Sequence, residues 1–248
     1  MRVVISNDLK FKIRDLIRTL GLDVRPNDIK SRSDLRLVHY LKIHHITTVL
    51  DVGANTGQFA RKLLRAGYDR SIVSFEALPH VHDELKAASQ RYGSQRWTVA
   101  PRCALGDQGG LVEFHVTNNL QSSSMLKPSE QMRSLSPTLE PREILTVECR
   151  RLDEVWDAGS SAACDTFLKI DAQGAEPFII NSATKVMPRI KGLLLEMPVL
   201  PLYEGQMRGR DLDRLVTDLG FELWDQYPGF RDGSTGRLFE CDAVYFRA

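Results

Sequence analysis

The sequence has no excess of charge of either sign. Its 248 residues include 33 Lys and Arg against 32 Asp and Glu, which leaves a formal net charge of +1. Proteins that bind nucleic acid usually gather Lys and Arg on one face, and attachment to an anionic membrane surface requires a polybasic run. The sequence has neither feature. We therefore expect no nucleic-acid partner and no electrostatic attachment to a membrane.

Long apolar runs are missing as well. The stretch MRVVISNDLKFKIRDL returns to polar residues after a short apolar segment, and it lacks the shape of a secretory signal peptide. No run approaches the ~20 apolar residues that a membrane-spanning helix needs. We therefore expect a cytoplasmic protein without an integral membrane segment.

Cysteine is scarce. Cys103, Cys149, Cys164 and Cys241 stand far apart, and no two of them form a CxxC pair. This spacing matches no common zinc site or redox motif, and it does not suggest a disulfide framework for a chain of this length. We expect reduced thiols that are mostly buried.

From residue 47 onward, β-rich apolar runs alternate with helical segments. The predicted strands include TTVLDVGA, SIVSFEAL, WTVAPRCALG, DTFLKIDA and IKGLLLEM. Such alternation predicts a doubly wound, mostly parallel α/β sheet. Ligands of these sheets bind outside the carboxyl ends of the strands, near the switch point after the first strand.

Two segments depart from this alternation. Residues 1–46 predict a helical extension, with one helix over 7–21 and a second from Asp34, and this extension suits a lid or a homodimer interface. Residues 47–248 form the main domain. Within it, residues 110–151 predict an inserted hairpin of two antiparallel strands around a long polar loop on the acceptor side.

The turn DVGANTGQFA after the first predicted strand narrows the choice of ligand. Gln58 and Phe59 follow Gly57, so the Lys-Ser/Thr pair of a phosphate-binding P-loop is missing. A dinucleotide would require glycine at Asn55, and Asp51 would place a negative charge near its pyrophosphate. A cationic ligand without phosphate, such as S-adenosylmethionine, meets neither objection. An ordinary tight connection between strand and helix remains the alternative.

Two further acidic residues follow in the order that such a cofactor requires. Glu76 ends the second predicted strand, 76 − 51 = 25 residues after Asp51, where a carboxylate can accept from both ribose hydroxyls. Asp107 follows the third predicted strand, where it could accept from the adenine amino group. Its neighbours Cys103, Ala104 and Leu105 could flank the adenine ring.

These motifs together resemble the FkbM-type methyltransferases. The resemblance rests on VLDVGANTGQFA, VSFEALP, ALGD, FLKIDAQGAEPFI and LLLEM, and it covers about residues 35–248. It implies a seven-stranded Rossmann-like methyltransferase sheet, S-adenosylmethionine as donor, and O-methylation of a hydroxyl in a sugar, a polyketide or another secondary metabolite. The chain departs from the family at Ala77, where proline is usual, and at Gln173, where glutamate is common. The predicted cofactor residues are Asp51, Gly53, Asn55, Gly57, Phe59, Glu76, Ala77, Ala104, Leu105 and Asp107.

Three residues on adjacent predicted strands are candidates for the chemistry. Asp171 and Glu196 end their strands and could activate the acceptor hydroxyl as a general base, or hold a Mg²⁺ ion between them. Asp171 is our first choice for the base; the alternatives are a cap of the following helix for Asp171 and a salt bridge or backbone brace for Glu196. Lys169 lies on the same side of its strand as Asp171, and it could polarise the acceptor or form an ion pair with either carboxylate.

The acceptor itself is a small molecule that the sequence does not name. The polar stretch NNLQSSSML could line its pocket, with Tyr203, Glu204 and Tyr227 as further walls and His115 as a remote candidate for the base. His44 and His45 are expected at the surface. Three other functions stay open: an N-methyltransferase on the same fold, an NAD(P)-dependent oxidoreductase, and a non-catalytic scaffold that binds the cofactor.

Overall fold

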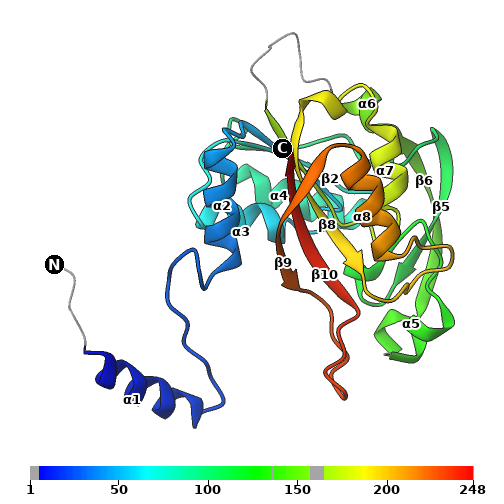
Figure 1. Cartoon of the computed structure of the whole chain (residues 1–248). Helices are drawn as coiled ribbons and strands as arrows, with labels where there is room; N and C mark the ends of the chain where they lie inside the picture. The colour runs from blue at the N-terminus through cyan, green and yellow to red at the C-terminus, as the bar shows by residue number, and fades with distance from the viewer. Residues whose placement is uncertain (1–5, 136, 157–164, 248) are drawn as a thin grey trace.

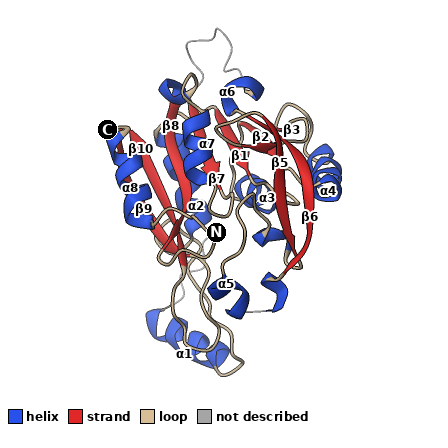
Figure 2. Ribbon diagram, turned by 90° about the vertical axis from the view of Figure 1, so that its right-hand side faces the viewer, coloured by secondary structure: helices blue, strands red, loops and turns tan. Residues whose placement is uncertain are grey.

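The computed structural model describes residues 6–135, 137–156 and 165–247 of the chain, so Cys164 lies outside the described residues. A seven-stranded sheet forms its centre (Figures 1 and 2), and β10 is the one strand that runs antiparallel to its neighbours. In spatial order the strands are β3 (Trp97–Val99), β2 (Ser71–Phe75), β1 (Thr48–Val52), β7 (Thr166–Ile170), β8 (Ile190–Pro198), β10 (Glu240–Arg247) and β9 (Phe221–Pro228). The doubly wound, mostly parallel seven-stranded sheet is confirmed.

Helices connect and cover these strands. They are α1 (Asn7–Arg18), α2 (Ser33–Ile43), α3 (Gln58–Arg65), α4 (Pro79–Gln90), α5 (Glu130–Leu135), α6 (Leu152–Val155), α7 (Glu176–Ser182) and α8 (Gly209–Asp218), with short 3₁₀ turns at η1 (Leu120–Ser122), η2 (Pro137–Leu139) and η3 (Met187–Arg189). Among the described residues, none of these helices is both long and apolar enough to cross a bilayer.

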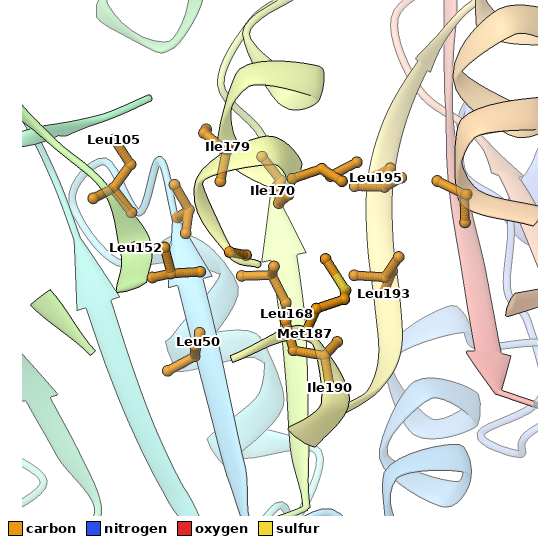
Figure 3. Close-up of a cluster of buried hydrophobic side chains, with 14 of the residues drawn as sticks. Leu50, Leu105, Leu152, Leu168, Ile170, Ile179, Met187, Ile190, Leu193 and Leu195 are labelled. Atoms are coloured by element: carbon orange, nitrogen blue, oxygen red, sulfur yellow. The ribbon is translucent and has the colours of Figure 1, made fainter. Parts of the chain in front are cut away.

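The core forms because strand side chains point alternately to the two faces of the sheet. On one face, Leu50, Leu168 and Leu193 pack with residues of α7 and α8 (Figure 3). On the other face, Val49 and Phe167 pack with residues of α2 and α3. Both faces of the central strands are therefore buried, as parallel strands between helix layers require. The polar side chains that could bind a ligand therefore lie at the carboxyl ends of the strands.

The order of the strands reverses between β1 and β7. The chain proceeds from β1 outward through β2 to β3, and then returns to place β7 on the other side of β1. The loops after these two neighbouring strands leave the sheet in opposite directions, which opens a crevice at this edge. The site described below lies there.

The third predicted strand, residues 97–106, is wrong as a single element. It is divided into β3 of the main sheet and β4 (Ala104–Leu105), which joins β5 (Gly110–Thr117) and β6 (Pro141–Arg150) in a second sheet. The backbone N–H of Ala100 still donates to the carbonyl of Ser74, but Pro101 has no N–H to continue the ladder. The predicted antiparallel hairpin of β5 and β6 is confirmed.

The two N-terminal helices differ in their packing. Helix α2 buries Leu37, Val38 and Leu41 against the sheet. Helix α1 lies apart from the body of the molecule (Figure 1), and its apolar side chains are exposed, with Phe11 at 64% and Leu16 at 67%. The segment predicted as one helical extension therefore consists of a packed helix and a separate one.

The prediction that His44 is a surface residue is wrong. Its ring stacks on Phe246 with centroids 3.9 Å apart and meets the edge of Trp224 at 4.4 Å. Burial lowers the pKa of His44, since the charged form loses water. His45 is exposed, as expected.

Candidate active site

The turn between β1 and α3 is shaped by three residues in left-handed conformations. Gly53, Asn55 and Gly57 have φ values of 69°, 48° and 87°. A Cβ on Gly53 would overlap the carbonyl oxygen of Asp171, and one on Gly57 would overlap the ring of Trp97. Asn55 tolerates this conformation, and its side-chain oxygen accepts from the N–H of Thr56 at 2.8 Å. The two glycines thus allow close packing of the chain around the turn.

Glu76 follows β2, and its carboxylate links the turn after β1 to the backbone after β2. One carboxylate oxygen accepts from the N–H of Asn55 at 2.9 Å, and the other accepts from the N–H groups of Ala77 and Leu78 at 2.9 and 2.8 Å. Burial raises the pKa of Glu76, although these three hydrogen bonds oppose the shift. The carboxylate is therefore fixed in position, and Glu76 lines the pocket.

Asp51 and Lys169 form a buried ion pair beneath the turn. The Nζ of Lys169 lies 3.1 Å from Asp51 and 3.5 Å from Asp171, and it donates to the carbonyl oxygens of Val52 and Gly53. Burial alone would lower the pKa of Lys169, but the two carboxylates raise it above its ordinary value. The lysine is a fixed cation that secures the turn, so the ion-pair alternative for Lys169 agrees with the geometry.

The loop after β7 places an amide between the two predicted catalytic carboxylates. The Nε2 of Gln173 donates to Asp171 at 2.9 Å and to Glu196 at 2.6 Å. Its Oε1 lies 2.6 Å from the hydroxyl of Tyr203. A Mg²⁺ ion bridging Asp171 and Glu196 would have to displace this amide. Within the described ranges, no group of three or more His, Cys, Asp or Glu side chains could hold a metal ion, so the structure gives Mg²⁺ no support.

Glu196 lies near a second acid, the buried Glu240, and the charges of the two groups influence each other. Burial, the charge of Asp171 and the charge of Glu240 raise the pKa of Glu196 well above its usual range. Neighbouring buried carboxyl groups disfavour each other's ionised forms, because their negative charges repel. Glu196 is thus held by the amide of Gln173, and it does not belong to the lining of the pocket.

One pocket runs along the carboxyl edge of the sheet. Seven of the predicted cofactor residues line one part of it, which we name the β1–β2 end: Gly53, Asn55, Phe59, Glu76, Ala77, Ala104 and Leu105. The other three predicted residues lie outside the lining. Asp51 is beneath the turn, Gly57 packs on Trp97, and Asp107 presents its backbone oxygen to Arg151.

The opposite part of the pocket, the β9–β10 end, is lined by Asp34 from α2, Lys62 from α3, Tyr227 from β9 and Asp242 from β10. Of these four residues, only Tyr227 is predicted from the sequence. Asp171 lies in the same lining. The lining thus contains four carboxylates (Asp34, Glu76, Asp171 and Asp242) against two ammonium groups (Lys62 and Lys169), which disfavours a pyrophosphate and suits a cationic ligand.

The inserted segment contributes part of one wall. Leu120, Gln121, Ser123 and Met125 line the pocket, so the stretch 118–126 does reach it. The hydroxyl of Ser124 instead donates to the carbonyl of Gln173 at 2.8 Å and ties the insert to the β7 loop.

The remaining acceptor candidates lie outside the lining. Tyr203 is buried behind Gln173, and Glu204 forms an exposed ion pair with Lys127. His115 lies within β5, where its backbone bonds to Ser124.

Comparison with known proteins places this geometry in a family. The model of the methyltransferase FkbM domain matches residues 51–223. The chain is 25% identical over 186 residues to 2-O-methyltransferase NoeI of Sinorhizobium fredii, which covers 73% of this chain and 74% of that protein.

Two solved structures are also similar. One is magnesium protoporphyrin IX methyltransferase (ChlM) from Synechocystis PCC 6803 with bound SAM, at 12% identity, a TM-score of 0.41 and full coverage of both chains. The other is precorrin-6y C5,15-methyltransferase from Geobacter metallireducens, at 11% identity, a TM-score of 0.44 and 87% coverage of each chain. The family model spans well over half of the sequence, and the chain therefore belongs to the FkbM methyltransferase family.

Proposed function

We propose that this protein transfers a methyl group from S-adenosylmethionine to a hydroxyl oxygen of a sugar or another polyhydroxylated small molecule. The observation that carries the proposal is the single pocket that joins an apolar end fitted to an adenosine with an end rich in hydrogen-bond acceptors. Membership of the FkbM family supports the methyl transfer, and the relative described as a 2-O-methyltransferase supports oxygen as the acceptor atom.

The residues of the β1–β2 end fit this donor. Ala104 and Leu105 offer apolar surface to the adenine, and the fixed carboxylate of Glu76 can accept from ribose hydroxyls. The turn at Gly53 and Asn55 would hold the methionine part, with the carboxylate of Asp171 close to its ammonium group. When bound, the donor supplies a methyl group activated by a positively charged sulfur.

The protein's own contribution is to orient the acceptor and exclude water, because the sulfonium already activates the methyl carbon. The buried pair of Asp51 and Lys169 and the bridge through Gln173 fix the floor of the pocket. The insert covers it with Leu120 and Met125, among others. Asp171, our sequence-based candidate for activating the hydroxyl, lies in the lining between the two ends.

The acid-rich lining is the observation that keeps an amine acceptor as a second candidate, because carboxylates also attract ammonium groups. A hydroxyl is favoured because an amine must first lose its proton to become a nucleophile, and the same carboxylates stabilise the protonated form. A dinucleotide cofactor is disfavoured because Lys169, the lysine beneath the turn, is already bound to Asp51 and Asp171 and is not available to a pyrophosphate.

The test has two stages. Calorimetry of the full chain with S-adenosylhomocysteine should give binding in the micromolar range, whereas NADH and NADPH should not bind. Turnover is then measured with a tritiated methyl donor and a panel of neutral monosaccharides, neutral oligosaccharides and amino sugars, and mass spectrometry locates the methyl group. Failure to bind S-adenosylhomocysteine at millimolar concentration would overturn the proposal; binding without any turnover would favour the scaffold, and methyl found only on nitrogen would favour the amine.

A further inference from the structure

Four side chains stand in one row across the carboxyl edge of the sheet. In the register of the strands, Asp242 of β10 lies opposite Glu196 of β8 on one side and opposite Tyr227 of β9 on the other. Asp171 follows Ile170, whose partner is Leu195, so it lies beside Glu196. Directly opposed residues point to the same face of a sheet, so Glu196, Asp242 and Tyr227 share one face. Asp171, Asp242 and Tyr227 line the pocket there, whereas Glu196 lies outside its lining.

Two of these groups already have partners within the protein before any ligand binds. Glu196 accepts from the amide of Gln173, and burial and the charge of Asp171 disfavour its ionised form. Asp171 receives the amide of Gln173 on one oxygen and lies near Lys169 with the other.

Asp242 differs from them. It lines the pocket, and its carboxylate forms no hydrogen bond and no ion pair with any described residue, although Lys169 and Lys62 act on it through their charges. The hydroxyl of Tyr227, its neighbour across the ladder, is buried and likewise has no hydrogen-bond partner in the part of the chain that the structure describes. A buried polar group without a partner is unfavourable and is expected to bind a ligand or water.

We propose that Asp242 is the general base of the methyl transfer and that Tyr227 beside it binds the acceptor molecule. This inference rests on the proposed function. The acceptor hydroxyl gives its proton to a carboxylate oxygen of Asp242 while a lone pair of the hydroxyl oxygen forms the new O–CH₃ bond. The C–S bond of the donor breaks, and its electron pair stays on sulfur, which becomes neutral. The Tyr227 hydroxyl holds a neighbouring hydroxyl of the acceptor, so the site selects compounds with two adjacent hydroxyl groups.

The charges around Asp242 agree with this role. Burial and the charge of Asp171 raise the pKa of Asp242 to about 6, while Lys169 and Lys62 act against the shift. Such a group is ionised at neutral pH and is still basic enough to take a proton in the transition state. Burial, followed by the charge of Asp242, raises the pKa of Tyr227, so its hydroxyl keeps its proton. The charged or titratable groups that face Asp242 are Asp171 and Lys169 on β7 and its loop, Glu196 on β8, Tyr227 on β9, Glu240 on β10 and Lys62 on α3.

The decisive variant is Asp242→Asn. We expect kcat to fall by about 10²- to 10⁴-fold, as for the loss of a general base. Wild-type kcat/KM should rise with pH through about 6 and then level off, and this acidic limb should vanish in the variant. Because the amide removes a charge repelled by Asp171, the fold should survive, and the Kd for S-adenosylhomocysteine should stay within twofold. Asp69→Asn is the matched control, since Asp69 is 70% exposed and outside the pocket.

Two companion variants separate a proton-transfer role from a structural one. With Asp242→Ala, added formate should restore turnover several-fold, because a small carboxylate can occupy the space that the side chain leaves. Tyr227→Phe should raise the KM for the acceptor about five- to tenfold with little change in kcat, and it should not lower the melting temperature, because no internal hydrogen bond is lost.

The outcomes distinguish the two proposals. Suppose the wild-type protein binds S-adenosylhomocysteine and methylates the panel. If Asp242→Asn then keeps kcat within threefold of wild type and retains the acidic limb, the role of Asp242 is overturned and the proposed function stands. Loss of the limb in Asp171→Asn alone would instead assign the base to Asp171. A wild-type protein that binds no S-adenosylhomocysteine overturns the proposed function itself.

Discussion

The two ends of the pocket are held in different ways. At the β1–β2 end, Glu76 accepts three backbone N–H groups and the turn at Gly53 packs directly on the loop after β7. At the β9–β10 end, Asp242 and the hydroxyl of Tyr227 have no partner among the described residues. One end is thus fixed before binding, while the other leaves its polar groups to the ligand. This division suits the proposed function, in which the donor binds at the fixed end and the acceptor at the other.

The largest effect is expected where the fixed end is most tightly packed. In Gly53→Ala, the new Cβ would overlap the Asp171 carbonyl oxygen at a φ of 69°. We expect the free energy of unfolding to fall by about 3–5 kcal/mol and binding of S-adenosylhomocysteine to be lost. Urea unfolding and calorimetry measure the two effects.

Gly67→Ala is the matched control for this variant. Gly67 also has a left-handed conformation, with φ of 93°, but nothing lies within 4 Å of a Cβ placed there. In Gly67→Ala, the free energy of unfolding should fall only by the cost of the left-handed conformation, about 1–2 kcal/mol, and S-adenosylhomocysteine should bind as in wild type. Equal losses in the two variants would show that the packing of the turn on the β7 loop is not what fixes this end.

The next largest effect concerns the carboxylate of the fixed end. In the wild-type structure, the backbone N–H groups of Asn55, Ala77 and Leu78 donate to the carboxylate oxygens of Glu76. In Glu76→Gln, an amide N–H₂ would replace one of these oxygens and face an N–H donor. We expect the Kd for S-adenosylhomocysteine to rise at least about tenfold, and the free energy of unfolding to fall by about 1–3 kcal/mol, because a buried donor loses its acceptor. Glu84→Gln, an exposed change on the following helix, should alter neither quantity. A Kd within twofold of wild type would remove Glu76 from the cofactor site.

The same difference explains how much of the site the sequence could predict. The β1–β2 end comes from residues that are close in sequence or placed by one β–α–β step, so Gly53, Asn55 and Glu76 could be identified from spacing alone. Asp242 becomes part of the site only because β10 pairs with β8 and β9. No local pattern shows which strand will lie beside β8. The sequence does show that Asp242 is a polar residue in the last strand. That position indicates a site residue only once the order of the strands is known.

The fold shows the same limit. The alternation of strands and helices predicted the main sheet, because periodicity and glycine punctuation are local properties. The division of residues 97–106 between two sheets depended on where β6 lies, far along the chain. The partners of Asp171 and Glu196 were hidden for a similar reason, because the bridging amide of Gln173 depends on a left-handed residue with φ of 55°.

A pH effect on stability tests the acids behind the β9–β10 end. Burial, followed by the charge of Asp171, raises the pKa of Glu240 to about 8. The folded state therefore binds a proton that the unfolded chain releases above about pH 4.5. The free energy of unfolding should then fall as pH rises from about 5 to 8, by an amount of about 1–2 kcal/mol.

Glu240→Gln should reduce this dependence, because the neutral amide has no charge to bury, while Asp242, whose pKa is also raised, keeps its own part of it. Urea unfolding at pH 5 and pH 8 measures it, and Glu222→Gln on the exposed side of β9 is the control. A wild-type protein that becomes more stable over this range would contradict the raised pKa of Glu240.

The smallest effect is expected at Asp107, where spacing and geometry give different expectations. From its position after the third predicted strand, the carboxylate would accept from the adenine amino group, and Asp107→Asn would weaken binding about tenfold. In the structure, Asp107 lies outside the pocket lining, and its contact with Arg151 uses the backbone carbonyl at 2.5 Å, which the substitution leaves in place. We therefore expect the Kd for S-adenosylhomocysteine to change less than twofold. A tenfold loss would mean that the loop after β4 turns its carboxylate inward on binding, and the fixed character of the β1–β2 end would then stop at Leu105.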